Sequence, residues 1–423
     1  MNASPTPRRW LRTSVLSIAS VAALLIVSGI WLNYRDEPPL DDSAPPVTAA
    51  QSQIDRGRYL ATVGNCMGCH TANGGRPMAG GVGIPTPFGT LFSSNITPDV
   101  ATGIGSWNAS HFWRAMHNGR AKDGRLLYPA FPYTSYTTTT REDSDAIFAY
   151  LRTFAPVEQA SPAHALRFPY DSQVALGAWR ALYFRPGRFV ETPDQSREWN
   201  RGAYLVNGLG HCAACHSSRN AFGATVDGAS LRGGIIAGQN WYAPPLGELS
   251  QPDIVSMLRT GLSTRGSASG PMADVVHTST QYLSDADLAA IATHLEGLPG
   301  ERRPAATAST RASLNGKGRL VYDQQCASCH GAAGEGHAGV YPPLAGNFTV
   351  NLDSSTNVIQ VILSGGFAVA TDANPRPFSM PPFKQSLGDA DIAAVASYVR
   401  QAFGNGAGEV SEIEVRRVKN AGP

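Results

Sequence analysis

The chain has 423 residues, which suffices for roughly two to four domains, and 42% of them are hydrophobic. Its formal net charge of +2 argues against a nucleic-acid partner or a strongly anionic one. The 44 glycines and 30 prolines predict short helices joined by long loops.

The N-terminal segment has the pattern of a membrane anchor. Arg8, Arg9 and Arg12 precede an apolar run, residues 15–32, that contains no charge. At about 1.5 Å per residue, a helix of this length reaches ~27 Å, close to the hydrocarbon thickness of a bilayer. The arginines place the N-terminus in the cytoplasm, and the rest of the chain then lies on the periplasmic side of the inner membrane. The alternative is a cleaved signal peptide, although the run is long for one and no small-x-small site follows closely.

The six cysteines fall in three copies of one pentapeptide. The copies are CMGCH, CAACH and CASCH, and C-x-x-C-H is the attachment motif of c-type haem. Disulfides or zinc sites are the alternatives, but neither requires a histidine after every second cysteine. We therefore predict three covalently bound haem c groups. The attachment residues are Cys66 and Cys69, Cys212 and Cys215, and Cys326 and Cys329, with His70, His216 and His330 as proximal iron ligands.

Each pentapeptide lies in a longer pattern that recurs three times. Before it comes a short predicted helix that opens with a glycine, namely Gly57, Gly202 or Gly318. After it come a Gly/Pro-rich loop and a closing helix. In the closing stretches "LSDADLAAIATHL" and "LGDADIAAVASYV", apolar residues fall at i, i+3, i+4 and i+7, which predicts one apolar stripe on each helix. Ser284 and Asp287 predict an N-cap for the first of these two helices.

The predicted fold is all-α, with three tandem cytochrome c-like domains after one N-terminal transmembrane helix. The anchor covers residues 1–34, and a Pro- and Asp-rich linker covers residues 35–52. The domains are expected at residues 53–155, 197–299 and 313–405. They are joined by a linker at 156–196, which contains one short helix-like run, and by a second linker at 300–312. Residues 406–423 are expected to form a polar and mobile tail.

The second axial ligand differs between the repeats. An electron-carrying c-type haem commonly has a methionine opposite its histidine. Met272 and Met380 lie in the loop before the closing helix of repeats two and three. Repeat one has Phe131 at that place, and phenylalanine has no lone pair with which to ligate iron. Met78 and Met116 are weaker candidates, so haem 1 is expected to be ligated from an unusual place or to be left open.

Four further residues near the motifs are not expected to ligate iron. His111 and His117 share a predicted helix with Met116 and are interpreted as surface residues or as residues behind the ligands. Met67 lies inside an attachment motif, and Met257 occupies a helix-core position.

The exported part of the chain resembles the three-haem cytochrome c subunits of membrane-bound bacterial dehydrogenases. The resemblance rests on "TPFGTLFSSNITPDVATGIGSW" at 86–107, "DGRLLYPAFPYTSY" at 123–136, "FRPG" at 184–187 and the three pentapeptides. It implies an electron relay with no substrate of its own. Electrons would come from a quinoprotein, flavoprotein or molybdenum hydroxylase subunit and pass to ubiquinone or a terminal oxidase. The alcohol dehydrogenase branch usually has methionine at the place of Phe131, and the Phe-bearing stretch looks more like cytochromes that accompany molybdenum hydroxylases acting on aldehydes or N-heterocycles.

Two other functions fit the same residues. One is a free-standing, membrane-anchored carrier that serves no dedicated dehydrogenase. The other is a haem enzyme in which an open haem 1 acts on peroxide or on a small sulfur or nitrogen compound.

Overall fold

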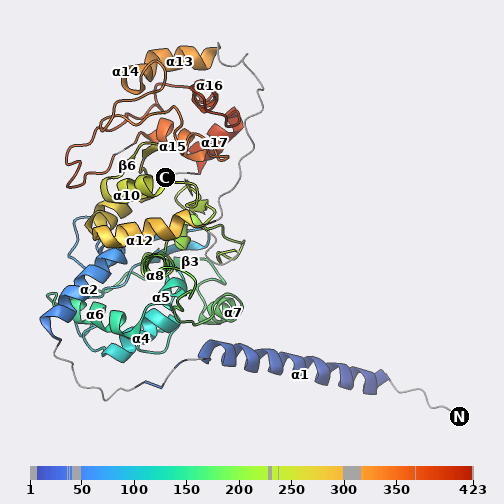
Figure 1. Cartoon of the computed structure of the whole chain (residues 1–423). Coiled ribbons are helices and arrows are strands. Elements are labelled where there is room, and N and C mark those ends of the chain that lie inside the picture. Colours follow the sequence, from blue (N-terminus) through green and yellow to red (C-terminus); the bar gives the residue numbers. More distant parts are fainter. Residues whose placement is uncertain are drawn as a thin grey trace.

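The structure is a computed structural model that describes residues 7–35, 37, 39–40, 49–226, 231–236, 238–298, 316–366 and 368–421. For residues 7–13, 19, 22, 25 and 26 it describes the backbone alone. The predicted linker at 300–312 and much of the one at 35–52 lie outside the described residues. The molecule is helix-rich, and Figure 1 shows its helices stacked along one direction, with α1 (Pro7–Tyr34) projecting from one end.

Paired helices from the three sequence repeats build the body of the molecule. We call the pairs unit 1, unit 2 and unit 3. Their opening and closing helices are α2 (Gln51–Val63) with α6 (Arg141–Leu151), α8 (Arg197–Asn207) with α12 (Asp285–Glu296), and α13 (Lys317–Gln325) with α16 (Asp389–Gln401). Each unit also has a middle helix, which is α4 (Ala109–Asn118), α10 (Gln251–Thr260) or α15 (Thr356–Ser364).

The glycine of each opening helix is the point at which the two helices cross. A Cβ atom added to Gly202 would lie 2.6 Å from the Ala290 carbonyl carbon and 2.8 Å from the His294 Cβ. Gly57 meets α6 and Gly318 meets α16 in the same manner. Any side chain there would hold the helices apart, so these positions require glycine for close approach.

The apolar stripes predicted for the closing helices are confirmed. In α12, Leu288 and Ala292 are fully buried, and Ile291 and Leu295 are nearly so. The Ser284 hydroxyl accepts a hydrogen bond from the Asp287 backbone N–H at 3.2 Å, which confirms the predicted N-cap.

The long loops contain short secondary-structure elements that the sequence did not reveal. A three-stranded antiparallel sheet has the order β1 (Gly83–Thr86), β2 (Gly89–Phe92), β3 (Ala165–Leu166). Two hairpins join β4 (Gly234–Ile236) to β5 (Trp241–Ala243) and β6 (Leu262–Ser263) to β7 (Gly266–Ser267). The remaining short helices are α3 (Cys66–His70), α5 (Tyr133–Tyr136), α9 (Ala213–His216), α11 (Pro271–Thr278), η1 (Thr280–Tyr282) and α14 (Ala327–His330).

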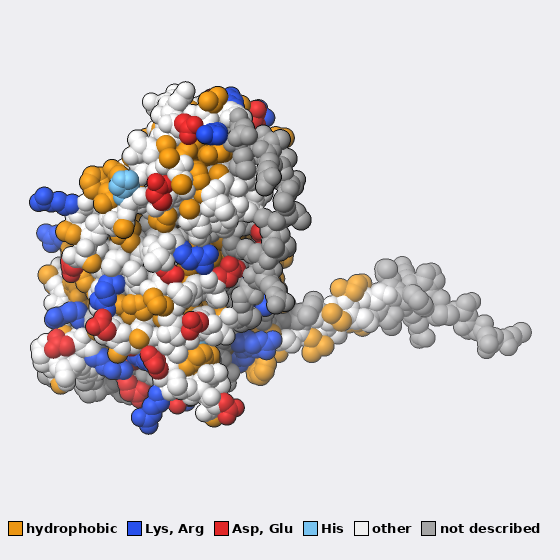
Figure 2. Space-filling view, turned by 45° about the horizontal axis from the view of Figure 1, so that its top comes forward, with side chains coloured by type: hydrophobic (Ala, Val, Ile, Leu, Met, Phe, Trp, Pro, Cys, Tyr) orange, Lys and Arg blue, Asp and Glu red, His pale blue; other side chains and the backbone are white. Residues whose placement is uncertain are grey.

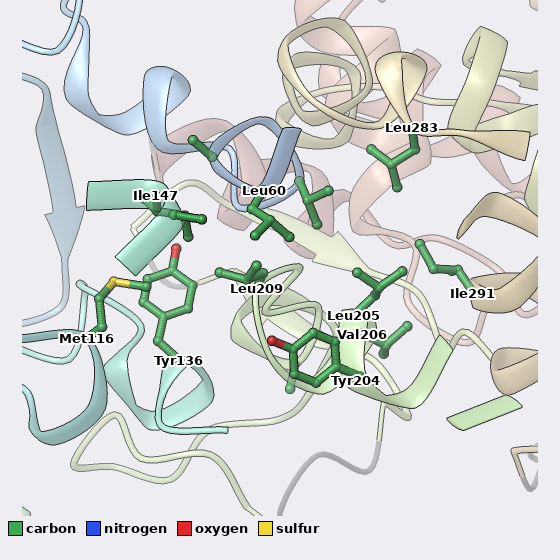
Figure 3. Close-up of a cluster of buried hydrophobic side chains, with 14 of the residues drawn as sticks. Leu60, Met116, Tyr136, Ile147, Tyr204, Leu205, Val206, Leu209, Leu283 and Ile291 are labelled. Atoms are coloured by element: carbon green, nitrogen blue, oxygen red, sulfur yellow. The ribbon is translucent and has the colours of Figure 1, made fainter. Parts of the chain in front are cut away.

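Units 1 and 2 share one hydrophobic core, whereas unit 3 has its own. The shared cluster contains Leu60 and Ile147 of unit 1 together with Leu205 and Ile291 of unit 2. Figure 3 shows these side chains converging from both units, with Tyr136 between them. The second cluster is built from α13, α15 and α16. The first two repeats are therefore packed as a pair.

Two expectations about the connecting segments need correction. The tail after residue 405 is not a polar mobile segment, because it folds into α17 (Glu412–Asn420) and packs against α15 and α16. Val415 and Val418 are buried there, and this apolar burial explains the ordering. The segment at 156–196 contains the expected helix, α7 (Gln173–Tyr183), and also β3, and it is packed against unit 1 rather than being a simple linker.

The predicted membrane span is not confirmed. Residues 7–34 do form one continuous helix, α1. Among the residues described, however, no helix combines the length and the apolar content that a membrane crossing demands.

Candidate haem sites

Each attachment motif forms a single turn of helix. The first lies in α3, and the other two place Cys212 and Cys326 at the N-cap positions of α9 and α14. One turn brings both cysteines of a motif and its histidine into the same small volume, which suits two thioether bonds and one iron ligand.

The three motif histidines are held by the same kind of hydrogen bond. The Nδ1 atoms of His70, His216 and His330 lie 2.7, 2.7 and 3.0 Å from a backbone carbonyl oxygen. Burial lowers the pKa of each imidazole, and the carbonyl contact acts in the opposite direction. With Nδ1–H donated to the carbonyl, the ring is neutral and Nε2 is free to bind iron.

The carbonyl groups that orient these histidines were missed by the sequence analysis. They belong to Ser94, Pro244 and Pro342. Pro244 and Pro342 each begin a Pro-Pro pair, in "APP" and "YPP", and that repeated dipeptide was the available signal. Because the separations from the histidines are 24, 28 and 12 residues, no fixed spacing identifies them.

The cysteine chemistry fits haem attachment better than the alternatives. All six thiols are free, so a disulfide framework is wrong. Burial raises the pKa of Cys66 and Cys212 to about 12 and that of Cys326 to about 11. Within the described part of the chain, no three His, Cys, Asp or Glu side chains gather as a metal ion would require. Paired thiols beside one oriented imidazole are the donor set that a covalent haem needs.

Phe131 occupies the place that Met272 has in unit 2. In unit 1 the Leu127 N–H donates to the carbonyl of Gly119, the C-cap of α4, at 2.8 Å. In unit 2 the Ala268 N–H donates to the carbonyl of Gly261, the C-cap of α10, also at 2.8 Å. Phe131 and Met272 both follow four residues after that contact. The equivalence inferred from the sequence therefore has a structural basis.

Met380 is positioned by a related contact in unit 3. Its N–H donates to the Gly366 carbonyl at 2.8 Å, and its own carbonyl accepts from the Gly366 N–H at 3.1 Å. Gly366 follows the C-cap of α15, so the loop is attached to the end of the middle helix here as well. The assignments of Met272 and Met380 as iron ligands stay predictions.

The two alternative methionines of unit 1 are both buried packing residues. Met116 lies on α4 in the shared core, and Figure 3 shows its sulfur directed at Tyr136. Met78 is also in that core, and its N–H donates to the Thr71 hydroxyl at 3.1 Å. Since Thr71 directly follows His70, this bond holds the Met78 loop next to the motif histidine and argues against a loop free to fold across the opposite face.

The surface interpretation of the two α4 histidines is wrong. His111 and His117 are both buried. The His111 ring receives the N–H of Asn108 and completes a capping box at the start of α4, while His117 stacks on Trp113 at 4.5 Å between ring centroids. Both act in helix capping or packing.

Units 1 and 2 are joined by a reciprocal pair of tyrosine hydrogen bonds. The Tyr204 hydroxyl of unit 2 donates to Asp143 of unit 1 at 2.6 Å. The Tyr59 hydroxyl of unit 1 donates to Asp287 of unit 2, also at 2.6 Å. Both aspartates lie in the first turn of a closing helix. Each carboxylate therefore stabilises its own helix N-terminus and binds the opposite unit.

Unit 3 lacks the residue that makes this exchange. Arg56 and Arg201 pair with the aspartate of their own unit, and Lys317 pairs with Asp391 of unit 3 at 2.7 Å in the same way. Where units 1 and 2 have tyrosine, unit 3 has Leu320, which is 62% exposed. The internal ion pair is thus common to all three units, and the pairing between units is confined to the first two.

The attachment motifs of units 1 and 2 lie beside each other at this interface. Asn65, directly before Cys66, accepts a hydrogen bond from the Thr278 hydroxyl of unit 2 at 2.8 Å. Burial raises the pKa of Cys215 of unit 2, and Cys69 of unit 1 contributes to that rise. Groups attached to these two motifs would be neighbours.

Comparisons with known proteins agree with this geometry. The cytochrome c family model matches residues 316–403, which is unit 3. The cytochrome c subunit of the quinone-dependent alcohol dehydrogenase of Gluconobacter oxydans is 37% identical over 88% of this chain and 84% of its own length. The chain belongs to the family of dehydrogenase cytochrome c subunits. This cytochrome subunit is also 35% identical to the fructose dehydrogenase cytochrome subunit of Gluconobacter japonicus, over 96% of this chain and 90% of that one.

A further relative is a longer protein. It is a subunit of the nicotinate dehydrogenase of Pseudomonas putida, and it is 40% identical over 95% of the cytochrome subunit, which spans only 34% of that protein's length. The shared family makes this chain an electron-transfer cytochrome subunit of a dehydrogenase complex and not its catalytic subunit.

Proposed function

We propose that the cytochrome subunit relays electrons through three covalently bound haem c groups, from a dehydrogenase catalytic subunit to ubiquinone or a terminal oxidase. When bound, each haem iron accepts and releases one electron. The chain's own residues attach the haem, orient the proximal imidazole and cover the haem with apolar side chains. The neighbouring motifs of units 1 and 2 favour rapid exchange between haems 1 and 2.

One observation carries this proposal. Each motif histidine donates Nδ1–H to a backbone carbonyl in the same way, although the carbonyls come from unrelated loops. A histidine that served only as a packing residue would not need its second nitrogen kept free three times over.

The haem number is tested by chemical analysis of the purified chain. A pyridine haemochrome assay, referred to the peptide mass, is expected to give three haems per chain. Replacing both cysteines of one motif with alanine is expected to remove one haem and to leave the other two. A wild-type value of one or two would refute the three-haem relay.

In this proposal α1 anchors the chain in the inner membrane, with the haem units on the periplasmic side. The support is the uncharged run at 15–32 and its flanking arginines. Resistance to extraction by alkaline carbonate is the expected behaviour. Complete release into the supernatant would contradict the anchor without affecting the haem assignment.

The partner is proposed to be an oxidising subunit that acts on an N-heterocyclic or aldehyde substrate. This choice over an alcohol dehydrogenase is supported by Phe131 and by the 40% identity to a subunit of a nicotinate dehydrogenase. Affinity purification from mildly solubilised membranes, followed by mass spectrometry, is expected to recover a molybdenum hydroxylase. A quinoprotein or flavoprotein would change the substrate class, and a chain that purifies alone would favour the free-standing carrier.

A second function is favoured by Phe131 alone. If no side chain replaces the missing methionine, haem 1 is open to small ligands. A carbon monoxide difference spectrum of the reduced protein is then expected to report about one responsive haem in three. The aromatic and apolar surroundings of Phe131, which include Tyr136 at 5.3 Å, offer few groups for acid–base catalysis, and this favours electron relay over substrate turnover.

A further inference from the structure

The last turn of α1 is bonded into the body of the molecule by Asn33. Its side-chain NH₂ donates to the Gly177 carbonyl of α7 at 2.9 Å, and its side-chain oxygen accepts from Arg180 Nε at 3.1 Å. Its backbone carbonyl accepts from Arg120 of unit 1 at 2.9 Å. The direction of α1 relative to α7 is therefore set by directional bonds and not left to a loose tether.

The chain just after α1 strengthens this junction. Glu37 forms an ion pair with Arg120 at 2.9 Å, and both side chains are buried. The Arg35 guanidinium donates to the Phe184 carbonyl, directly after α7, at 2.6 Å. Because a buried ion pair holds only with good geometry, these contacts fix the end of α1 against unit 1 and α7.

The helix α7 has one buried face and one apolar face without a partner in the described structure. Leu176 and Arg180 are directed inward and are buried. Val174 is 85% exposed, Leu182 is 70% exposed, and Ala178 lies between them with i, i+4 and i+8 spacing. This spacing puts the three side chains in one outward stripe. Phe168, shortly before the helix, is 85% exposed as well.

Aromatic side chains border this stripe. Trp179 stacks near Tyr183 at 5.6 Å between ring centroids, and Tyr183 lies 6.4 Å from Phe222 of unit 2. Arg167 and Arg185 are exposed at either end of the segment. Trp and Tyr next to exposed aliphatic residues, with arginines at the edge, are typical of a surface that lies at a membrane–water boundary.

The direction of α7 suits such a surface. In Figure 1, α1 runs lengthwise while α7 is seen nearly end-on beside the base of α1. A bilayer crossed by α1 would therefore have its surface along α7. Trp31 and Tyr34 are exposed at this end of α1, and Figure 2 shows hydrophobic side chains along α1 with Lys or Arg side chains where it meets the body.

We propose that the outer face of α7, formed by Val174, Ala178 and Leu182 together with Phe168, rests in the headgroup region of the periplasmic leaflet. This inference rests on the proposed anchoring by α1. The junction at Asn33 holds α7 against the lipid surface, so that unit 1 keeps a fixed orientation and height over the membrane. The segment expected to be a linker is then a membrane-contact platform.

The test uses the full holoprotein in phosphatidylcholine–phosphatidylglycerol vesicles. Since the native cysteines are consumed by haem attachment, one introduced cysteine gives a single site for a nitroxide spin label. The labelled variants are Val174→Cys and Leu182→Cys on the platform, Leu24→Cys in α1, and Leu320→Cys as control. Leu320 has comparable exposure but lies on α13, at the far end of the molecule from α1 (Figure 1).

Collision rates with oxygen and with a water-soluble nickel chelate are measured by power-saturation EPR on the reduced protein. The labels at Val174 and Leu182 are expected to collide mainly with oxygen, as lipid-contacting labels do. The label at Leu320 is expected to collide mainly with nickel. Adding Asn33→Ala is expected to raise nickel collisions at Val174 towards the Leu320 value while Leu24 remains protected.

The outcomes separate this inference from the proposed anchor. A water-exposed Val174 with a lipid-protected Leu24 would overturn the platform and leave the anchor intact. A water-exposed Leu24 would refute the anchor and the platform together. A Val174 label that is protected from both reagents only after the catalytic subunit is added would assign the surface to that subunit and also overturn the proposal.

Discussion

The crossing of α8 and α12 at Gly202 permits a sharp test of how the haem units pack. Replacing Gly202 with alanine adds a single methyl group. That carbon would lie 2.6 Å from the Ala290 carbonyl carbon, with the Ala290 oxygen closer still. Non-bonded carbons prefer about 3.5–4.0 Å, so the helices must separate by roughly 1 Å.

The expected cost follows from which atoms obstruct the methyl group. Overpacking a tight contact typically costs about 1–3 kcal/mol. The obstruction at Gly202 is the backbone of α12, which cannot rotate away, so the upper part of that range applies. Alanine recovers ~1 kcal/mol of helix propensity over glycine. We expect a net loss of about 2 kcal/mol, or a fall of about 4–8 °C in the apparent Tm for a paired body of this size.

The assay is thermal unfolding of the holoprotein, followed by far-ultraviolet circular dichroism and by the Soret band. Gly177→Ala in α7 is the matched control, because its added carbon would meet nothing closer than the Leu126 Cδ1 at 3.7 Å. That control is expected to raise stability by about 0.5–1 kcal/mol. Equal Tm values for Gly202→Ala and Gly177→Ala would refute the close-crossing argument.

Tyr204→Phe removes a hydrogen bond to a buried carboxylate and is expected to destabilise the pair of units by about 1.5–3 kcal/mol in chemical denaturation; no shift in the denaturation midpoint would contradict that role. Burial opposes ionisation of Asp287, yet hydrogen bonds from Arg201 and Tyr59 hold its pKa below the usual value, so its stabilising contribution is complete above about pH 4 and disappears as the pH falls through the folded-state pKa. Asp287→Asn should therefore flatten the acid limb of a Tm-against-pH curve, and an unchanged limb would show that another group dominates it. Phe131→Met is expected to abolish carbon monoxide binding at haem 1 and to raise the lowest midpoint in a redox titration, whereas an unaltered spectrum would mean that haem 1 already has a second ligand. Val415→Asp places a charge at a fully buried site and is expected to cost at least about 3 kcal/mol, seen as early melting of unit 3; wild-type melting would mean that α17 is dispensable.

The sequence by itself determined the chemistry and the repeating plan of this protein. The six cysteines and three histidines are adjacent along the chain, so their grouping does not depend on the fold. The closing helices were predictable because their apolar period is a local property, and the buried stripe on α12 confirms it. Phe131 was recognised as a departure because the loop before the closing helix can be aligned between repeats.

Only the tertiary structure decided how the repeats are joined. The carbonyls that orient the motif histidines come from 12 to 28 residues away, at no constant spacing, so local patterns cannot single them out. Tyr59 and Asp287 are 228 residues apart, and their hydrogen bond exists because units 1 and 2 bury one core between them. The tail was misread for the same reason, since the valines of α17 are too few to predict a buried helix until α15 and α16 provide the surface that covers them. Local periodicity determines which elements form, whereas the free energy gained by burying their faces against distant partners determines where they pack.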